Sequence, residues 1–299
     1  MKRSILVIGS SNTDMVIKAP HLPAPGETIL GGTFLMNPGG KGANQAVAAA
    51  RLGGAVTLIC KTGNDIFGKQ SIQLFKAEGI DTSYIFEDLH QPSGVALITV
   101  DDNAENCIVV ASGANAHLTS RDLMAAANCI KDAHIILMQL EIPVKTVAYA
   151  AALAAGMDKK VILNPAPVCE LNDELLTHIC IITPNETEAF MLTGVKVTGE
   201  KSAGQAARLL HARGIATVII TLGAKGAFVL HEDKCTLVHS PAVHAVDTTA
   251  AGDIFNGALA VALSEDQTMV EAVEFACKAA ALSVTRLGAQ ASAPYRSEV

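Results

Sequence analysis

The sequence has little charge and no excess of positive charge. Only 17% of its 299 residues are charged, and 22 Lys and Arg stand against 29 Asp and Glu, a net charge of −7 at pH 7. No Lys- or Arg-rich stretch offsets this deficit, so we expect neither a nucleic-acid-binding surface nor binding to an anionic membrane. The rest of the composition, half hydrophobic with ordinary amounts of Gly and Pro, excludes disorder, collagen-like repeats and a coiled coil. We expect a small polar ligand instead.

Paired cysteines and long apolar runs are also missing. The seven Cys stand alone, without a C-x-x-C pair or a Cys/His grouping at zinc spacing, which favours buried thiols in a reducing cytosol. The apolar run from Ile5 to Ile8 ends at Gly9, short of the roughly 7–15 residues of an export signal. No run approaches the roughly 18 residues of a membrane span. We therefore expect a cytoplasmic protein without a membrane segment.

Short β-branched runs alternate with longer helical patterns through most of the chain. The short runs are nearly continuously apolar, as in parallel strands that are covered on both faces. This alternation predicts an α/β fold with a central, mostly parallel sheet flanked by helices. The expected strands are residues 5–9, 56–61, 134–139, 161–164, 179–183 and 217–221. The expected helices are residues 43–52, 67–78, 120–130, 144–155, 186–192, 202–211 and 268–286.

One further group of strands breaks the alternation. Residues 28–34, 94–100 and 106–111 have strand patterns, and residues 101–103 (Asp-Asp-Asn) join the last two as a hairpin turn would. We expect a small β-sheet that projects from the main domain as a lid, with strands within about residues 13–36 and 93–111. Because no internal repeat or low-complexity linker interrupts the sequence, residues 1–299 are expected to form a single domain.

The common nucleotide-binding signatures are absent. Lys41 is followed by Gly rather than Ser or Thr, so residues 39–42 are not a Walker A motif, and residues 9–11 lack the G-x-G-x-x-G of a dinucleotide fold. Four polar, Gly-rich junctions remain, each where a strand runs into a loop or helix, which is where open α/β sheets bind ligands. They are residues 10–14, 37–45, 221–226 and 247–253.

Each junction has a purely structural interpretation as well. Residues 10–14 are typical of a helix cap or turn, residues 37–45 of a turn with a cap, and residues 221–226 of a hairpin turn. Alternatively, the glycines of the second junction let backbone N–H groups approach a polar ligand. In the fourth, small residues leave the N–H groups of residues 250–252 uncovered at a helix start, which predicts an anion site. Asp253 either accepts a proton from a hydroxyl there or only caps the helix.

The helix that follows the fourth junction has a stripe of small or polar side chains. Asp253, Asn256, Gly257 and Ala260 fall on one of its faces at helical spacing. Such a stripe indicates close packing against another helix or close approach by a ligand.

Residues 37–45 and 247–256 resemble the two signature regions of the ribokinase-like carbohydrate kinase family. The resemblance extends over almost the whole chain, from residues 9–10 to residues 288–290, and includes the stretches 39–46, 138–141, 164–167 and 182–188. It implies a central sheet with a β-sheet lid and ATP-dependent phosphorylation of the 5-hydroxyl of D-ribose, giving D-ribose 5-phosphate and ADP. Asp253 matches the catalytic base, and the backbone amides of Ala250, Ala251 and Gly252 match an anion hole for the transferred phosphoryl group.

The same resemblance assigns binding positions residue by residue. The sugar-binding positions are Asn12, Asp14, Gly40, Lys41, Asn44, Glu141 and Asp253. The nucleotide positions are Asn185, Thr221, Gly223, Ala224, Lys225, Gly226, Gly252 and Cys277. Asn185 and Glu188 match an N-x-x-E element that positions Mg²⁺, an ion suited by hard oxygen donors. The positions around a monovalent cation, expected to be potassium, are Asp247, Thr249, Ser283, Arg286, Gly288 and Ser292.

Two features differ from the family pattern, and two other functions stay open. Residues 249–252 read Thr-Ala-Ala-Gly where many relatives have a second Gly, and Cys277 stands where relatives commonly place a polar or imidazole side chain near the adenine.

The resemblance also implies a homodimer that pairs through the lid strands. The alternatives are a kinase for deoxyribose, another sugar or a nucleoside, and a sugar sensor without catalytic activity.

Overall fold

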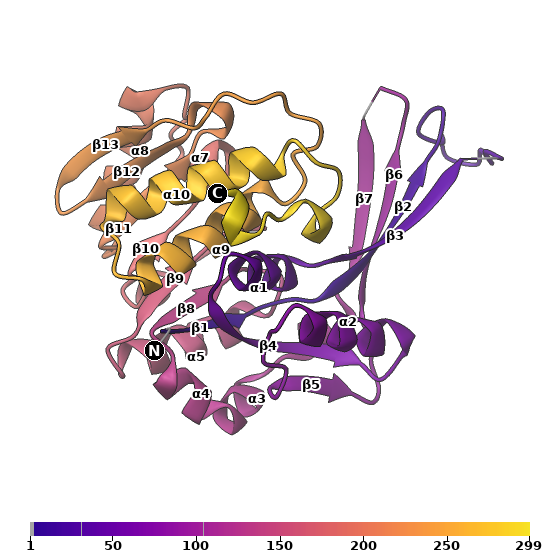
Figure 1. Cartoon of the computed structure of the whole chain (residues 1–299), viewed down its shortest axis with the longest axis horizontal. Coiled ribbons are helices and arrows are strands. Elements are labelled where there is room, and N and C mark those ends of the chain that lie inside the picture. The colour runs from indigo at the N-terminus through magenta and orange to yellow at the C-terminus, as the bar shows by residue number, and fades with distance from the viewer. Residues whose placement is uncertain (1–2, 31, 104) are drawn as a thin grey trace.

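The computed structural model describes residues 3–30, 32–103 and 105–299, and its centre is a nine-stranded sheet (Figure 1). The strands are β1 (Ser4–Ile8), β4 (Ala55–Gly63), β5 (Ile85–Asp88), β8 (Ile135–Met138), β9 (Lys160–Leu163), β10 (Ile181–Ile182), β11 (Thr217–Thr221), β12 (Ala227–His231) and β13 (Lys234–Val238). Their order across the sheet is β13-β12-β11-β10-β9-β8-β1-β4-β5. Neighbouring strands are parallel except that β12 runs antiparallel to β11 and β13. The predicted α/β fold with a mostly parallel sheet is confirmed.

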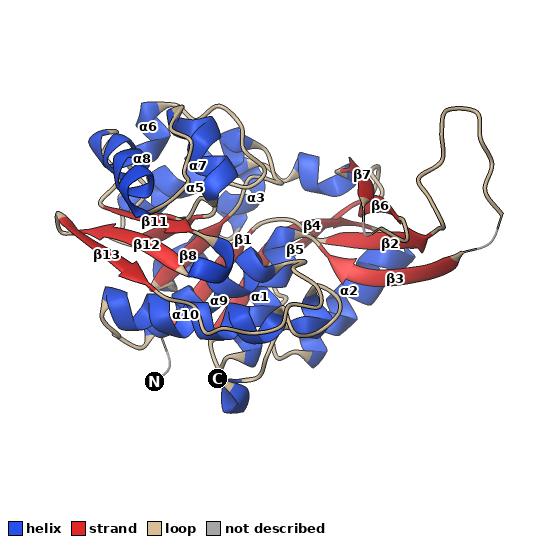
Figure 2. Cartoon of the chain, turned by 90° about the horizontal axis from the view of Figure 1, so that it is seen from above, coloured by secondary structure: helices blue, strands red, loops and turns tan. Residues whose placement is uncertain are grey.

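Helices cover both faces of this sheet, in two layers that Figure 2 shows above and below the strands. One layer holds α1 (Lys41–Arg51), α2 (Ile66–Ala77), α9 (Ala251–Ser264) and α10 (Met269–Ser283). The other holds α3 (Ser120–Ala125), α4 (Ala127–Asp132), α5 (Val144–Ala155), α6 (Asp173–Leu176), α7 (Glu186–Thr193) and α8 (Glu200–Ala212). Strand β1 explains the arrangement: Ile5 and Val7 pack into the first layer, and Leu6 and Ile8 into the second. Because both faces are covered, the strand is apolar at each position from Ile5 to Ile8.

A smaller sheet of four strands projects from one side of the molecule (Figure 1). It contains β2 (Asn12–Lys18), β3 (Thr33–Gly39), β6 (Gly94–Val100) and β7 (Asn106–Ala111), in the order β3-β2-β6-β7. The predicted turn between β6 and β7 is present, since the Asp101 backbone N–H donates to the carbonyl of Glu105 at 3.0 Å. We call these four strands the lid.

Three predicted element boundaries were wrong. The strand expected at residues 28–34 is β3 at Thr33–Gly39, because its pairing with β2 runs from Lys18 opposite Thr33 to Asn12 opposite Gly39; Gly31 lies outside the described residues. Residues 10–14, interpreted as a cap or turn, lead into strand β2. The helix expected at residues 120–130 is broken at Ala126 into α3 and α4.

The stripe of small residues on α9 packs against α1. A Cβ on Gly257 would lie 2.8 Å from both the Gln45 carbonyl oxygen and the Ala48 Cβ, closer than side chains approach in folded proteins. The glycine therefore lets the two helices approach closely, which is one of the two interpretations the sequence allowed. This contact also brings the first turn of α9, with Asp253, against the first turn of α1.

None of the helices that the described part of the chain forms is long and apolar enough to cross a membrane.

Candidate active site

Buried polar side chains gather beyond the carboxyl ends of the parallel strands. Ser10 follows β1, Gln139 follows β8, Asn164 follows β9 and Thr183 follows β10, and all four are buried. This is the edge of an open α/β sheet at which ligands bind. The first turns of α1 and α9 lie at the same edge, so the second and fourth Gly-rich junctions of the sequence meet there.

Asp253 lies at the centre of this cluster, in the first turn of α9. Its side chain is 5% exposed, and each carboxylate oxygen accepts one hydrogen bond. Asn44 Nδ2 donates to Oδ2 at 3.0 Å, and Gln45 Nε2 donates to Oδ1 at 2.9 Å. Burial raises the pKa of Asp253, whereas the charge of Lys41 and these two hydrogen bonds act in the opposite direction. The carboxylate is thus held by α1 and does not merely cap its own helix.

Further side-chain amides hold these two donors in place. Gln290 Nε2 donates to Asn44 Oδ1 at 3.2 Å, and Gln139 Nε2 donates to Gln45 Oε1. Gln45 Nε2 also donates to Asn164 Oδ1 at 3.1 Å. Sequence reasoning assigned no role to Gln45, Gln139, Asn164 or Gln290. The available signal was an amide directly after an apolar strand, at residues 139 and 164.

The start of α1 is closely packed against the end of β1. Gly40 has a φ of 88°, and a Cβ there would lie 2.7 Å from the backbone nitrogen of Asn12. A Cβ on Gly42 would lie 2.5 Å from the backbone nitrogen of Ser10. The glycines of this junction therefore let two backbones meet, in addition to any ligand they admit.

Glu141 caps α1 from another part of the chain. Its Oε2 accepts a hydrogen bond from the backbone N–H of Lys41 at 2.9 Å and one from Ser10 Oγ at 2.5 Å. A carboxylate at a helix N-terminus neutralises the partial positive charge of that end. Glu141 was predicted as a sugar ligand, and the structure gives it this structural contact as well.

Acidic groups surround a single lysine at this site. The charge of Asp253 raises the pKa of Lys41 in spite of its burial, and Glu141, Glu188 and Asp14 add to the effect. For Asp14, burial first and then the charges of Glu141 and Asp253 raise the pKa to about 6. The predicted sugar-binding residues Asp14, Lys41, Glu141 and Asp253 are therefore neighbours in the structure.

Asn12, another predicted sugar-binding residue, is fixed by a residue that sequence reasoning missed. Asn115 Nδ2 donates to Asn12 Oδ1 at 2.7 Å, and Asn115 Oδ1 accepts from the backbone N–H of Ser11 at 2.9 Å. Both asparagines are buried. Because Asn115 lies in a short 3₁₀ helix, Gly113–His117, no strand or helix pattern in the sequence draws attention to it.

The predicted nucleotide positions come from the start of α7, the β11–β12 hairpin, the start of α9 and helix α10. Asn185 and Thr221 form an isolated parallel bridge, in which the Thr221 N–H donates to the Pro184 carbonyl at 3.0 Å. The loop from Gly223 to Gly226 connects β11 to β12, so the hairpin interpretation of this junction is confirmed. Its residues 223–225 are exposed, as a loop that receives a ligand must be. Cys277, on α10, is buried, and burial raises the pKa of its thiol to about 12.

Asn185 and Glu188 form a reciprocal capping box at the start of α7. The Asn185 N–H donates to Glu188 Oε2 at 2.8 Å, and the Glu188 N–H donates to Asn185 Oδ1 at 2.8 Å. Burial raises the pKa of Glu188, which also interacts with the charges of Lys41 and Asp253. Within the described ranges, no group of three or more His, Cys, Asp and Glu could hold a metal ion by itself.

The turn before α9 has an unusual backbone. Ala250 precedes the helix with a φ of 60°, a left-handed conformation that costs a residue with a Cβ roughly 1–2 kcal/mol. Of the three amides predicted to form an anion hole, that of Ala251 donates to the Thr248 carbonyl at 3.2 Å. The amides of Ala250 and Gly252 take part in none of the hydrogen bonds found among the described residues. A Cβ on Gly252 would meet no atom within 4 Å, so open space lies beside this turn.

Asp247 ties this turn to the loop that follows α10. Its Oδ1 accepts from the Thr249 N–H at 2.9 Å and its Oδ2 from the Gly288 N–H at 2.8 Å. Burial alone would raise the pKa of Asp247, but the hydrogen bonds from Thr249 and Gly288 outweigh it and lower the pKa. Of the other predicted cation positions, Ser283 and Ser292 use their hydroxyls on nearby carbonyls, and Arg286 pairs with Glu298 at 2.5 Å.

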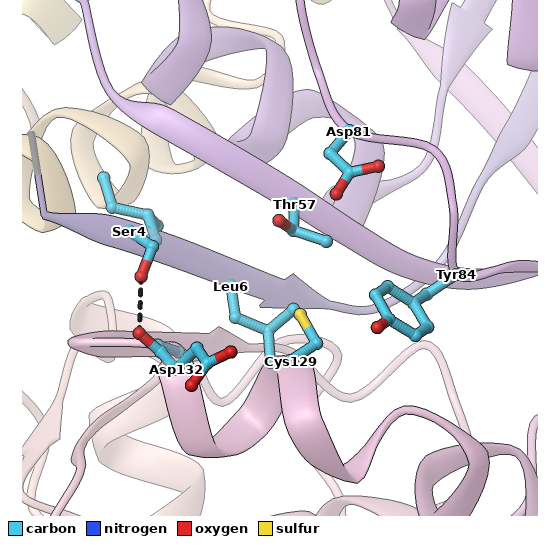
Figure 3. A pocket seen from close by; sticks show the side chains of 9 residues that line it. Ser4, Leu6, Thr57, Asp81, Tyr84, Cys129 and Asp132 are labelled. Carbon is cyan, nitrogen blue, oxygen red and sulfur yellow. Dashed lines mark hydrogen bonds between the residues drawn. The ribbon is translucent and has the colours of Figure 1, made fainter.

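Two cavities lie away from this cluster. One, of about 180 Å³, is at the opposite edge of the sheet, where Ser4 begins β1, and Asp81, Tyr84 and Cys129 point into it (Figure 3). Burial raises the pKa of the Cys129 thiol to about 11, so it stays protonated at neutral pH. The other, of about 320 Å³, lies between β13 and α10 and is lined by residues that include Glu274.

The fold and the cluster define a class of protein. At one edge of a mostly parallel sheet lie a buried carboxylate at a helix start, a group of polar side chains and a glycine-rich hairpin loop. This arrangement is suited to the transfer of a group between two bound molecules. The model of the pfkB family of carbohydrate kinases matches residues 2–296. The chain belongs to this family.

Named relatives have similar lengths and folds. The chain is 49% identical over 298 residues to the ribokinase of Haemophilus influenzae, covering 100% of this chain and 97% of that one. It is 39% identical over 293 residues to the deoxyribokinase of Salmonella typhi, covering 97% and 95%. The structure of Arabidopsis thaliana ribokinase complexed with ribose and ATP superposes with a TM-score of 0.92 at 32% identity, covering 99% of this chain and 97% of that one.

Proposed function

We propose that this chain is an ATP-dependent sugar kinase that phosphorylates the 5-hydroxyl of D-ribose, giving D-ribose 5-phosphate and ADP. The observation that carries the proposal is the position of Asp253. Its buried carboxylate lies among the residues that match the sugar site and within electrostatic reach of Glu188, on the nucleotide side. The likeness to the Haemophilus influenzae ribokinase over the full length supports the same activity.

In the proposed reaction Asp253 orients the 5-hydroxyl and accepts its proton as the oxygen attacks the γ-phosphoryl group of ATP. Phosphoryl transfer depends mainly on positioning and on neutralising charge. The free amides of the turn before α9 would donate to the phosphoryl oxygens, and Lys41 would add positive charge nearby. Burial raises the pKa of Asp253, which brings a carboxylate closer to the basicity that proton acceptance needs.

Sugar recognition is assigned to the polar side chains around Asp253. Asn12, Asp14, Lys41 and Asn44 offer acceptors and donors for the ribose hydroxyls, and we assign Gly40, at the start of α1, to the same site. An analogue that lacks one hydroxyl would leave one of these buried groups unpaired, so the site should discriminate strongly. Glu141 would contact the sugar through Oε1, because its Oε2 is occupied by α1.

The nucleotide is assigned to the β11–β12 loop with Asn185 and Thr221. We include Ala224, Lys225, Gly226 and Gly252 in this site, with Cys277 near the adenine. The capping box leaves Glu188 Oε1 free and uses one lone pair of Asn185 Oδ1, so these two oxygens would hold Mg²⁺ through water. Bound with ATP, Mg²⁺ would neutralise charge on the β- and γ-phosphates. We assign the enzyme to the cytoplasm, where ATP is available and reducing conditions fit the seven unpaired cysteines. Only Cys60 and Cys277 are buried, so the expectation that all seven thiols are buried was wrong.

A monovalent cation, potassium, is assigned to the loops that Asp247 joins. Residues 247, 249, 283, 286, 288 and 292 would surround it, most of them through backbone carbonyls, and the cation would fix the turn that carries the free amides. Asp247→Ala should lower activity and reduce the response to potassium. Equal rates in potassium and in a bulky organic cation, at matched ionic strength, would contradict this assignment.

The lid is assigned to a homodimer interface. By strand register, the side chains of Ile17, Phe34, Met36, Leu97 and Val109 lie on the lid face opposite Asp14. All five are exposed in the single chain. An apolar patch of this kind usually marks a protein–protein contact.

A second candidate substrate is deoxyribose, which the likeness to the Salmonella typhi deoxyribokinase favours. Initial rates with ATP, Mg²⁺ and potassium on D-ribose, 2-deoxy-D-ribose, D-fructose and a nucleoside would decide between them. We expect kcat/KM to be highest for D-ribose. A higher value for deoxyribose would reassign the substrate, and sugar binding without ATP consumption would indicate a sensor.

A further inference from the structure

Gln45 has contacts that its place in the sequence does not suggest. It is completely buried in the first turns of α1, and it makes three hydrogen bonds through one amide group. Nε2 donates to Asp253 Oδ1 and to Asn164 Oδ1, and Oε1 accepts from Gln139 Nε2. Its amide therefore joins α9 to the ends of β8 and β9.

The two donors to Asp253 differ in what else they can do. Asn44 is among the residues that match the sugar site, so its amide has to serve the ligand as well as the carboxylate. All three hydrogen bonds of Gln45 go to protein groups that are themselves buried, namely Asp253, Asn164 and Gln139. Gln45 can thus keep its bond to Oδ1 whether or not a sugar is bound.

We propose that Gln45 is a positioning residue that holds the Asp253 carboxylate through Oδ1, so that Oδ2 stays aimed at the attacking hydroxyl. This inference rests on the proposed function for its catalytic meaning. The two amides behind Gln45 make it effective, because Gln139 and Asn164 fix which way its amide faces. With the amide reversed, its oxygen would face a carboxylate oxygen, and the two would repel each other.

The contact also has an electrostatic consequence. The charged groups that face Asp253 are Lys41 from α1, Glu141 after β8, Asp14 from β2 and Glu188 from α7. Only Lys41 is positive, so the two amide donors supply much of what stabilises the ionised carboxylate. Removal of the Gln45 donor destabilises the charged form, and this raises the pKa of Asp253.

The test compares Gln45→Met, which keeps the size of the side chain and removes its donors, with the wild-type enzyme. We expect kcat on D-ribose to fall about ten- to a hundredfold, as for a slightly misplaced catalytic group. The KM values for ribose and ATP should change little, because Gln45 touches neither. The acid limb of the kcat–pH profile should move up by about one pH unit, the size expected for losing a hydrogen bond to a charged group.

Thr146→Val is the matched control for stability. It removes a buried hydrogen bond, 2.7 Å from Thr146 Oγ1 to the Leu118 carbonyl, in the helix layer on the other side of the sheet. It should lower the melting temperature and leave the pH profile unchanged. A Gln45→Met enzyme that behaves like this control, or that raises the ribose KM alone, overturns the inference.

Two further measurements decide the remaining cases. If Gln45→Met does not fold, Gln139→Met replaces it in the test. This variant frees Oε1 of Gln45 but leaves its donors, so it should shift the acid limb of the kcat–pH profile in the same direction by a smaller amount. An unshifted limb overturns the inference.

If the wild-type chain shows no turnover with ribose, the proposed function fails. The ¹³C carboxyl resonance of Asp253, identified by its loss in Asp253→Asn, should then still titrate at higher pH in Gln45→Met, and an unchanged midpoint overturns the inference.

Discussion

The carboxyl group of Asp14 lies in surroundings that disfavour its ionised form. Burial and the charges of Glu141 and Asp253 raise its pKa from 3.8 to about 6, a shift equivalent to about 3 kcal/mol. Because the folded state binds this proton more tightly than the unfolded chain, the protein loses stability as the pH rises from about 4 to about 6. The loss is nearly complete at pH 6 and complete by about pH 7.

Asp14→Asn should therefore stabilise the protein at neutral pH. At pH 7.5 we expect a higher melting temperature than in the wild type and a free energy of unfolding that is larger by up to about 3 kcal/mol. At pH 4.5 both increases should be much smaller. Ribose affinity, measured by calorimetry, should fall in the same variant, whereas ATP affinity should not. A gain in melting temperature that is equal at both pH values would contradict the account of Asp14.

At the scale of single residues, the sequence assigned roles to some side chains of the polar cluster but not to the side chains that hold them. Asp14, Lys41 and Asp253 belong to motifs whose resemblance to a family assigns each position. The family motif contains Gln45, but nothing in the sequence shows that its amide faces Asp253, since that contact joins residues 208 positions apart. Asn115 was missed for the same reason, because its partner Asn12 is 103 positions away.

Two glycines of α9 illustrate different requirements of one element. Gly257 faces α1, where a Cβ would overlap backbone atoms of Gln45 and Ala49, whereas a Cβ on Gly252 would meet nothing within 4 Å. Gly257→Ala should therefore cost about 1–3 kcal/mol of stability by overpacking. Gly252→Ala should leave stability unchanged or raise it by up to about 1 kcal/mol, because Ala favours the helix.

Activity should respond in a different way to the second substitution. The methyl group that Gly252→Ala adds would occupy the space beside the free amides, where the phosphoryl group is proposed to lie, so kcat should fall at least about tenfold. Thermal unfolding and initial rates measured on both variants would check this. A fully active Gly252→Ala enzyme would move the anion site away from this turn.

Local patterns predicted the central elements well because packing and propensity agree there. Strand β11 and helix α5 lie at the predicted residues 217–221 and 144–155. The lid was harder, because the extent of β3 is set by pairing with β2 and not by its own residues. Strand β2 itself begins with Asn12, Thr13 and Asp14, polar residues that are typical of a turn when read alone.

For the whole molecule, the lid carries the proposed dimer interface. Leu97 is 54% exposed in the middle of its apolar face, so Leu97→Asp should convert a dimer into monomers, measured by light scattering. The control is Leu209→Asp, because Leu209 is similarly exposed, at 47%. It lies on α8, in a helix layer of the main sheet and not in the lid. Equal masses for Leu97→Asp and the wild type, both dimeric or both monomeric, would remove the lid interface.

The central claim is that Asp253 accepts the proton of the ribose 5-hydroxyl, and Asp253→Asn tests it most directly. The substitution keeps the shape of the side chain, so calorimetry should show ribose and ATP still binding. Formation of D-ribose 5-phosphate, followed by ³¹P NMR, should slow by about 10²–10⁴, the usual loss for a general base. A variant that keeps more than half of the wild-type rate would contradict the assignment of Asp253.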